Sequence, residues 1–345
     1  MITRMRIMRF TFALLVVCLL PLLISSEVAA QPQAYIKFDG SAGNYDEILD
    51  PSTGDFSVNP GVGLTVAAWF RPDALHFDLT DGSTDQYVNW LGKGCGVNLN
   101  GDPLSCVGRG EVDTRTGTQR QEWTFRIYSQ TLPLPCPPEL CPRQNRISFY
   151  AYNWSPPEGM MCQNEGIGSY FQQPVDPEQW IHVVGVIDDR EDLTQSPRAK
   201  TTAIYKDGNF IRCDQYQATG APGCQRVPEQ GPGQCPRPIF PAHGTAPVRI
   251  GRRDRDGYFN GAIAEVRIWN RPLDQDEVAR VYSGIGPLPD GLVGEYLLNG
   301  TADDTSGNPN GPNNGTVFGT TWSWWTDGSQ LPAEPNIGRP FSGSL

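Results

Sequence analysis

The sequence predicts an all-β protein in which two antiparallel sheets pack face to face. Ten or more short segments alternate apolar and polar residues, which is the period of a β-strand, and turn residues separate them. With 38 Gly and 31 Pro among 345 residues, the chain suits many turns and few helices. One stretch, beginning at Asp274, carries a helical start signal. We therefore expect a β-sandwich with one short helix and long loops.

The first 30 residues have the pattern of a secretory signal peptide. Three arginines precede an apolar run at 10–24 that is short for a membrane span, and Val28 and Ala30 provide a small-residue cleavage site. No later stretch is apolar enough to span a bilayer. We expect a secreted or extracytoplasmic protein, cleaved near Ala30.

The net charge of −11 argues against a nucleic-acid partner, because phosphates are bound by Lys and Arg. Removal of the signal peptide, which carries three arginines and one glutamate, makes the chain more acidic still. An acidic surface is compatible with solubility outside the cell and with calcium.

Cysteine usage predicts that disulfides staple the long loops. Of nine Cys, one falls in the signal peptide, and an even number in a secreted chain indicates disulfide pairing. Close spacing favours the pairs Cys95–Cys106 and Cys136–Cys141, and the pairing of the other four is open. No pair has the C-x-x-C spacing of a zinc ribbon. The eight candidates are Cys95, Cys106, Cys136, Cys141, Cys162, Cys213, Cys224 and Cys235.

The expected strands follow one another along the chain. In the first half they share a clear alternation, at 34–38, 64–70, 88–91, 123–127 and 147–151. The last two flank a Pro- and Cys-rich loop and are expected to form a hairpin. Residues 180–187 are almost continuously apolar, which predicts a strand covered on both faces. Strands at 201–205 and 210–213 flank Asp207-Gly208, a strong hairpin signal.

The stretch 248–284 combines two strands with the expected helix. Residues 248–250 and 262–269 alternate as strands. Asp274 with Glu277 three residues later is a capping box, and Gly284 is a stop signal. The apolar residues of the helix repeat on one side, so we expect the helix to lie on a sheet.

These motifs resemble the laminin-G-like jelly-roll domains of the concanavalin A-like lectin/glucanase superfamily. The matching segments are Tyr35–Gly40, Trp180–Val186, Tyr205–Gly208, Ile250–Arg252, Phe259–Gly261, Glu265–Arg271 and 273–278. The resemblance implies a jelly-roll sandwich, which we expect over residues 31–321. The remainder, 322–345, contains three tryptophans and then turns Pro- and Gly-rich, so we expect a poorly ordered tail.

The segment 291–298 occupies an unusual place. In the family a segment of this kind usually opens the domain, whereas here it follows the helix. It either supplies a strand to the same sandwich or begins a truncated second repeat. We favour the first, because an isolated strand would leave its apolar face and edge uncovered.

The resemblance also implies a structural calcium ion. Asp39 and Asp304 match positions at which such domains often hold one, with Asn44 and Asp303 as helpers, and Ca²⁺ prefers oxygen ligands of this kind. The alternative is that these residues only form turns.

A catalytic site is not expected. The glucanases of this superfamily use paired carboxylates, and Glu111 with Asp113 begins such a pattern. No acid follows in 114–120, however. His182 lies in the apolar 180–187 segment and is expected in the core.

Sugar binding is the favoured function, because aromatic faces stack on sugar rings. Tyr152, Asn153 and Trp154, next to Tyr150, form the candidate site, to which Trp90 and Trp123 could contribute. We therefore expect a secreted, non-enzymatic domain that recognises carbohydrate or a glycosylated or matrix surface. The alternatives are a structural or adhesive protein–protein interaction module and a polysaccharide-cleaving enzyme.

Overall fold

A computed structural model describes most of the sandwich. The described residues are 34–41, 43–49, 54–77, 87–94, 121–129, 143–152, 166–225, 241, 247–252 and 258–324. Among them no helix is long and apolar enough to cross a membrane. Residues 1–30, Glu111 and Asp113 lie outside the described ranges, as do all the candidate cysteines except Cys213 and Cys224.

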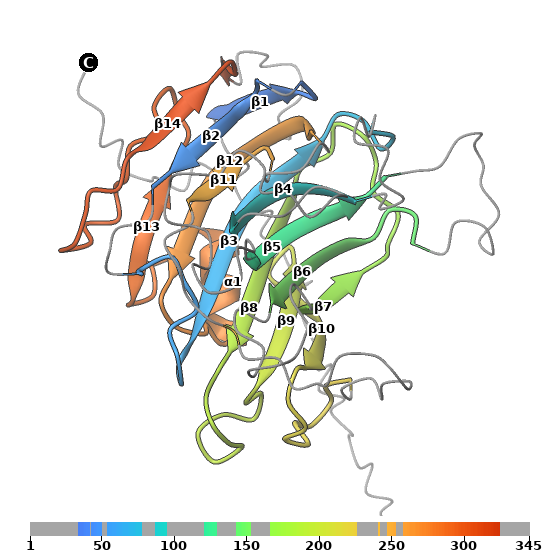
Figure 1. Ribbon diagram of the computed structural model, residues 1–345, viewed down its shortest axis with the longest axis vertical. Coiled ribbons are helices and arrows are strands. Elements are labelled where there is room, and N and C mark those ends of the chain that lie inside the picture. The colour runs from blue at the N-terminus through green and yellow to red at the C-terminus, as the bar shows by residue number, and fades with distance from the viewer. Residues whose placement is uncertain are drawn as a thin grey trace, which may run out of the picture.

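Two antiparallel sheets face each other (Figure 1). Sheet A has the order β10-β9-β8-β3-β12-β1-β15, with β13 also paired to β12. Its strands are β1 (Ala34–Asp39), β3 (Gly63–Pro72), β8 (Ile181–Asp188), β9 (Thr201–Lys206), β10 (Asn209–Gln215), β12 (Asn260–Trp269), β13 (Leu292–Tyr296) and β15 (Thr321–Trp324).

Sheet B has the order β14-β2-β11-β4-β5-β6-β7. Its strands are β2 (Tyr45–Ile48), β4 (Tyr87–Gly94), β5 (Gln121–Tyr128), β6 (Ile147–Tyr152), β7 (Gly166–Phe171), β11 (Val248–Ile250) and β14 (Gly315–Phe318). The expected all-β jelly-roll sandwich is confirmed.

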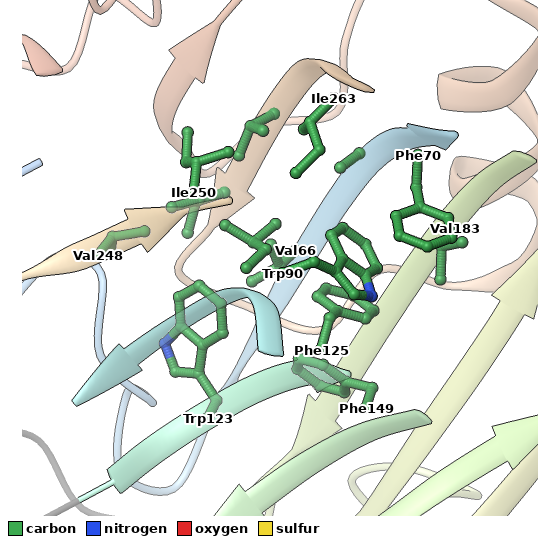
Figure 2. Close-up of a cluster of buried hydrophobic side chains, with 14 of the residues drawn as sticks. Val66, Phe70, Trp90, Trp123, Phe125, Phe149, Val183, Val248, Ile250 and Ile263 are labelled. Carbon is green, nitrogen blue, oxygen red and sulfur yellow. The ribbon is translucent and has the colours of Figure 1, made fainter. Parts of the chain in front are cut away.

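The core fills the space between the sheets (Figure 2). An aromatic series crosses it: the ring centroids of Phe70 and Trp90 are 4.4 Å apart, those of Trp90 and Phe125 4.8 Å, and those of Phe125 and Phe149 4.6 Å. All four side chains are fully buried. Each such burial contributes about 2–3 kcal/mol to folding, and the contact of Phe70 on β3 with Trp90 on β4 joins sheet A to sheet B.

Helix α1 (Gln275–Ser283) covers the outer face of sheet A. The expected capping box is present at Asp274 and Glu277, and Gly284 ends the helix in the left-handed conformation. Val278 and Val281 of the helix are buried in a cluster that includes Val184 and Val186 of β8. This second cluster explains why β8 is apolar on both faces, as the sequence predicted.

The late segment 291–298 completes sheet A. Its strand β13 pairs with β12, from Val266 opposite Tyr296 to Trp269 opposite Leu292. Strand β1 pairs with the preceding part of β12, from Asn260 to Ile263. Both strands therefore lie along one edge of β12. This is the arrangement expected if the segment 291–298 supplies a strand to the same sandwich.

Four strands were not expected from the sequence: β2, β7, β14 and β15. The boundary expected after residue 321 falls inside β15, where Trp322 pairs with Ile36. The sheet therefore extends to Trp324. Cys213 and Cys224, two of the four cysteines whose pairing was open, form a disulfide at the end of β10.

A candidate binding face on the second sheet

The outer face of β4 to β7 carries a group of tyrosines and an arginine. Alternate residues of these strands point into the core, which leaves their neighbours on the opposite face. We call this surface the tyrosine–arginine face; its residues are Tyr87, Arg126, Tyr128, Ser148, Tyr150, Tyr152 and Tyr170. Among the tyrosines, Tyr152 is buried, and the other four are half-buried.

Arg126 occupies the middle of this face, between two rings. Its Cζ lies 3.9 Å from the ring centroid of Tyr87 on β4 and 3.7 Å from that of Tyr150 on β6. Because β4 and β6 flank β5, the two rings approach the guanidinium from opposite sides. Its Nε donates a hydrogen bond of 3.3 Å to the Oγ of Ser148. These contacts hold the side chain in place by cation–π attraction.

Two glycines let the tyrosine rings lie across β7. Gly168 pairs with Tyr150 and Gly166 with Tyr152. A Cβ on Gly168 would lie 2.2 Å from Cδ2 of Tyr150, and a Cβ on Gly166 would lie 2.7 Å from Cδ1 of Tyr152. Such distances are too short for any side chain, so the rings rest on the backbone of β7. The result is a group of tyrosine rings that lie against the strand on the outside of the sheet.

Further arginines border the face. The ring of Tyr170 has the Cζ of Arg146 at 3.9 Å and that of Arg212 at 4.1 Å from its centroid. Arg143 Nη1 donates a hydrogen bond of 2.6 Å to the hydroxyl of Tyr87. Arg212 is neutralised by Asp214, with 2.5 Å between Nη2 and Oδ1.

The binding residues predicted from the sequence lie partly on this face. Tyr150 and Tyr152 lie on the face, and Asn153 and Trp154 fall outside the described residues. Trp90 and Trp123 are fully buried in the core, so their expected contribution to a sugar site was wrong. Trp123 Nε1 instead donates to the carbonyl of Phe56 at 2.8 Å.

Sequence reasoning missed Arg126, Tyr87, Tyr128 and Tyr170. A usable signal was present in the string Gly-Ile-Gly-Ser-Tyr-Phe at 166–171. Glycine at alternate positions of a strand indicates a close approach by another group, here the rings of β6.

The two expected calcium ligands do not lie together. Asp39 on β1 pairs with Asn260, whereas Asp304 bridges to Tyr296, which pairs with Val266. Asn260 and Val266, which mark the positions of the two aspartates on β12, are six residues apart, or about 20 Å along the strand.

The contacts of each carboxylate are local. Asp304 accepts backbone N–H groups from Glu295 and Ser306 on Oδ1, at 3.1 and 3.0 Å, and from Asn313 on Oδ2, at 3.1 Å. Asp39 Oδ1 accepts the N–H of Ser41 at 2.8 Å. This geometry does not fit one shared ion. In the described part of the chain, no group of three or more His, Cys, Asp or Glu side chains is placed to hold a metal.

His182 is buried between sheet A and helix α1, as a core residue, as expected. It is 1% exposed, and its ring centroid lies 5.2 Å from that of Trp69 and 5.6 Å from that of Tyr282. Burial, and then the charge of Arg267, lowers its pKa to about 3. The imidazole is therefore neutral at physiological pH and serves packing.

The fold is a jelly-roll sandwich, and tyrosine side chains lie on the outer face of sheet B. Residues 229–279 match the family model Laminin_G_3, described as the concanavalin A-like lectin/glucanases superfamily. This match confirms the resemblance expected from the sequence. No curated protein matches the chain.

Several solved structures are similar at low identity. A candidate carbohydrate-binding protein from Bacteroides ovatus is 15% identical with a TM-score of 0.46, over 86% of this chain and 61% of that protein. A SAP-like pentraxin from Limulus polyphemus is 11% identical with a TM-score of 0.44, over 86% of this chain and 97% of the pentraxin. Domain 4 of an arabinanase from Geobacillus stearothermophilus, in complex with arabinotriose, is 14% identical with a TM-score of 0.35, over 72% and 76%. The chain thus spans less than two thirds of the Bacteroides protein, and at these scores the likenesses carry no argument about function.

Proposed function

We propose that this chain is a secreted, non-enzymatic recognition domain that binds carbohydrate on the tyrosine–arginine face. The observation that carries the proposal is the position of the Tyr150 ring, which lies against the backbone of Gly168 with Arg126 beside it. A flat aromatic ring stacks on the apolar face of a sugar, and a neighbouring arginine donates to its hydroxyl or acidic groups. The match to a lectin/glucanase superfamily model agrees with this function.

Secretion is supported by two features. The signal-peptide pattern at 1–30 directs export, and the disulfide between Cys213 and Cys224 is typical of an oxidising compartment. Mass spectrometry of the secreted protein, without reduction, would test both. Intact residues 1–30 or free thiols at these two positions would contradict secretion through that route.

The binding experiment compares wild type with Tyr150→Ala on a panel of immobilised polysaccharides. We expect the variant to bind the preferred polysaccharide at least about fivefold more weakly, because one stacking partner contributes about 1–3 kcal/mol. Tyr45→Ala is the matched control, since Tyr45 is a half-buried tyrosine on β2 of the same sheet, where it stacks on Phe318 at 4.6 Å. Equal loss in both variants would contradict the proposed site.

Two results would favour the other functions. Release of reducing ends from the same polysaccharides, abolished by Glu111→Gln, would show an enzyme. Retention of an extracellular protein partner after deglycosylation, with no polysaccharide bound, would show a protein–protein interaction module.

Calcium binding stays a separate prediction. The positions of Asp39 and Asp304 provide no shared site for it. A rise in Tm with calcium that chelator reverses would support an ion elsewhere in the chain, and a Tm unchanged by chelator would remove it.

A further inference from the structure

We propose that the tyrosine–arginine face selects acidic saccharides, in which a carboxylate or sulfate group is bound by Arg126. This inference rests on the proposed function and specifies its ligand. Its first support is a contrast between two groups of arginines in an acidic chain. Seven described arginines have a carboxylate within 4 Å: Arg71, Arg190, Arg212, Arg249, Arg267, Arg271 and Arg280. Among the described residues, no carboxylate contacts the guanidinium of Arg126, Arg143 or Arg146.

These three arginines lie close to one another. Arg126 pairs with Ser148, and Arg146 lies two residues before Ser148, or about 7 Å along the strand. Arg143 reaches the hydroxyl of Tyr87, whose ring is also one of the two that cover Arg126. In a protein with a net charge of −11, this face is thus a local positive region. Such a region attracts anions even when the whole protein is acidic.

The orientation of Arg126 favours an oxyanion over a neutral hydroxyl. Rings close to the guanidinium on two sides limit the directions from which a ligand can reach its N–H groups. In the described part of the chain, its hydrogen-bond partners are Ser148, on Nε, and Tyr150, and the remaining N–H donors are left for a ligand. The edge of a guanidinium matches the two oxygens of a carboxylate or sulfate. A half-buried cation without a counter-ion is unfavourable, and an acidic ligand relieves that penalty whereas a neutral sugar does not.

The test compares matched acidic and neutral polysaccharides by isothermal titration calorimetry. The carboxylate pair is polygalacturonate and its fully methyl-esterified form, and the sulfate pair is dextran sulfate and dextran. We expect at least one acidic polymer to bind tenfold or more tightly than its neutral partner, and the difference to shrink as salt is raised from 50 to 300 mM. The pair that shows the difference identifies the acidic group.

The variants are Arg126→Met and Arg126→Lys, with Arg280→Met as control because Arg280 lies on exposed helix α1. We expect Arg126→Met to abolish the preference for the acidic polymer. Arg126→Lys should retain part of this preference, since lysine keeps the positive charge but lacks the two parallel N–H donors of the guanidinium. The wild-type comparison remains decisive if Arg126→Met does not fold.

The outcomes separate this inference from the proposed function. Equal binding of acidic and neutral polymers would overturn the preference for acid and leave carbohydrate binding intact. Acid preference that persists in Arg126→Met and Arg126→Lys would overturn the role of Arg126. Absence of binding to any polymer, here and in the wider panel, would contradict both.

Discussion

Arg267 on β12 and Glu295 on β13 form an ion pair 28 residues apart in the chain, with 2.8 Å between Nε and Oε1. A second carboxylate, that of Glu265, lies 2.9 Å from Nη1 of the same arginine. The arginine side chain is only 3% exposed. The pair therefore joins the late strand β13 to sheet A through a buried charge.

Replacement of Arg267 by Met should lower the free energy of unfolding by about 3 kcal/mol, because two largely buried carboxylates then lose the cation that balances their charge. Urea unfolding measures the change. Arg280→Met, with the arginine 47% exposed, should change stability by less than about 0.5 kcal/mol. An unchanged stability of Arg267→Met would show that the ion pair is not needed and that β13 is held by backbone pairing and by the burial of Val293 and Tyr296.

Replacement of Gly168 by Ala should weaken both the fold and saccharide binding. The new methyl group displaces the Tyr150 ring from β7, and we expect a loss of about 1–3 kcal/mol in stability together with weaker binding. Gly43→Ala is the control, because nothing lies within 4 Å of a Cβ at that position. The measurements are urea unfolding and titration with the preferred polysaccharide. Unchanged binding in a folded Gly168→Ala protein would argue against a sugar on Tyr150.

Asp46 should make the protein less stable as pH rises. Its carboxylate is fully buried, both oxygens lack a hydrogen-bond partner, and burial raises its pKa from 3.8 to about 7. A pKa raised in the folded state means that the protein keeps a proton that the unfolded chain releases above about pH 4. Stability from this group is therefore full below pH 3.8 and falls until about pH 7.

The Asp46→Asn variant removes this dependence. Relative to wild type, it should gain on the order of 2–4 kcal/mol between pH 4 and pH 8, measured by urea unfolding at several pH values. A stability difference that stays constant with pH would show that the buried carboxyl group is not the source.

His182 has the opposite pH dependence. The pKa of His182 is lowered to about 3 in the folded state. As pH falls through 6.5, the imidazole therefore takes up a proton in the unfolded chain but stays neutral in the folded chain. Stability from this group is present above pH 6.5 and is lost as pH falls toward 3. His182→Phe should therefore gain about 2–3 kcal/mol relative to wild type between pH 7.5 and pH 4.5. In NMR spectra, an imidazole signal of His182 that shifts near pH 6.5 would contradict this account.

Much of the fold could be predicted because its signals are local. The alternation at 64–70 and 123–127, the Asp207-Gly208 turn and the capping box at Asp274 each depend on neighbours within a few residues. The continuous apolar run at 180–187 also indicated cover on two faces. Strands β2, β14 and β15 were missed because they are four residues long, and β2 and β14 also stand in Gly- and Asn-rich sequence. Such segments become strands only when a neighbouring strand pairs with them.

The candidate site was harder to predict for the same reason. Tyr150 and Tyr152 attracted notice because they stand together in sequence, whereas Tyr87 and Arg126 lie on other strands with no local sign of a shared site. Strand pairing brings Tyr87, Arg126 and Tyr150 into contact across β4, β5 and β6. Trp90 and Trp123 are core residues because their positions in β4 and β5 face sheet A.

Local sequence was thus sufficient for the class of fold, the helix and its caps, because hydrophobic period, turn chemistry and capping act over short distances. Three-dimensional packing alone decided that β13 completes sheet A, that Trp90 and Trp123 are core residues, and that Arg126 lies between two tyrosine rings. These features depend on which strand lies next to which, and that choice follows from the burial of both sheets together and not from any single segment.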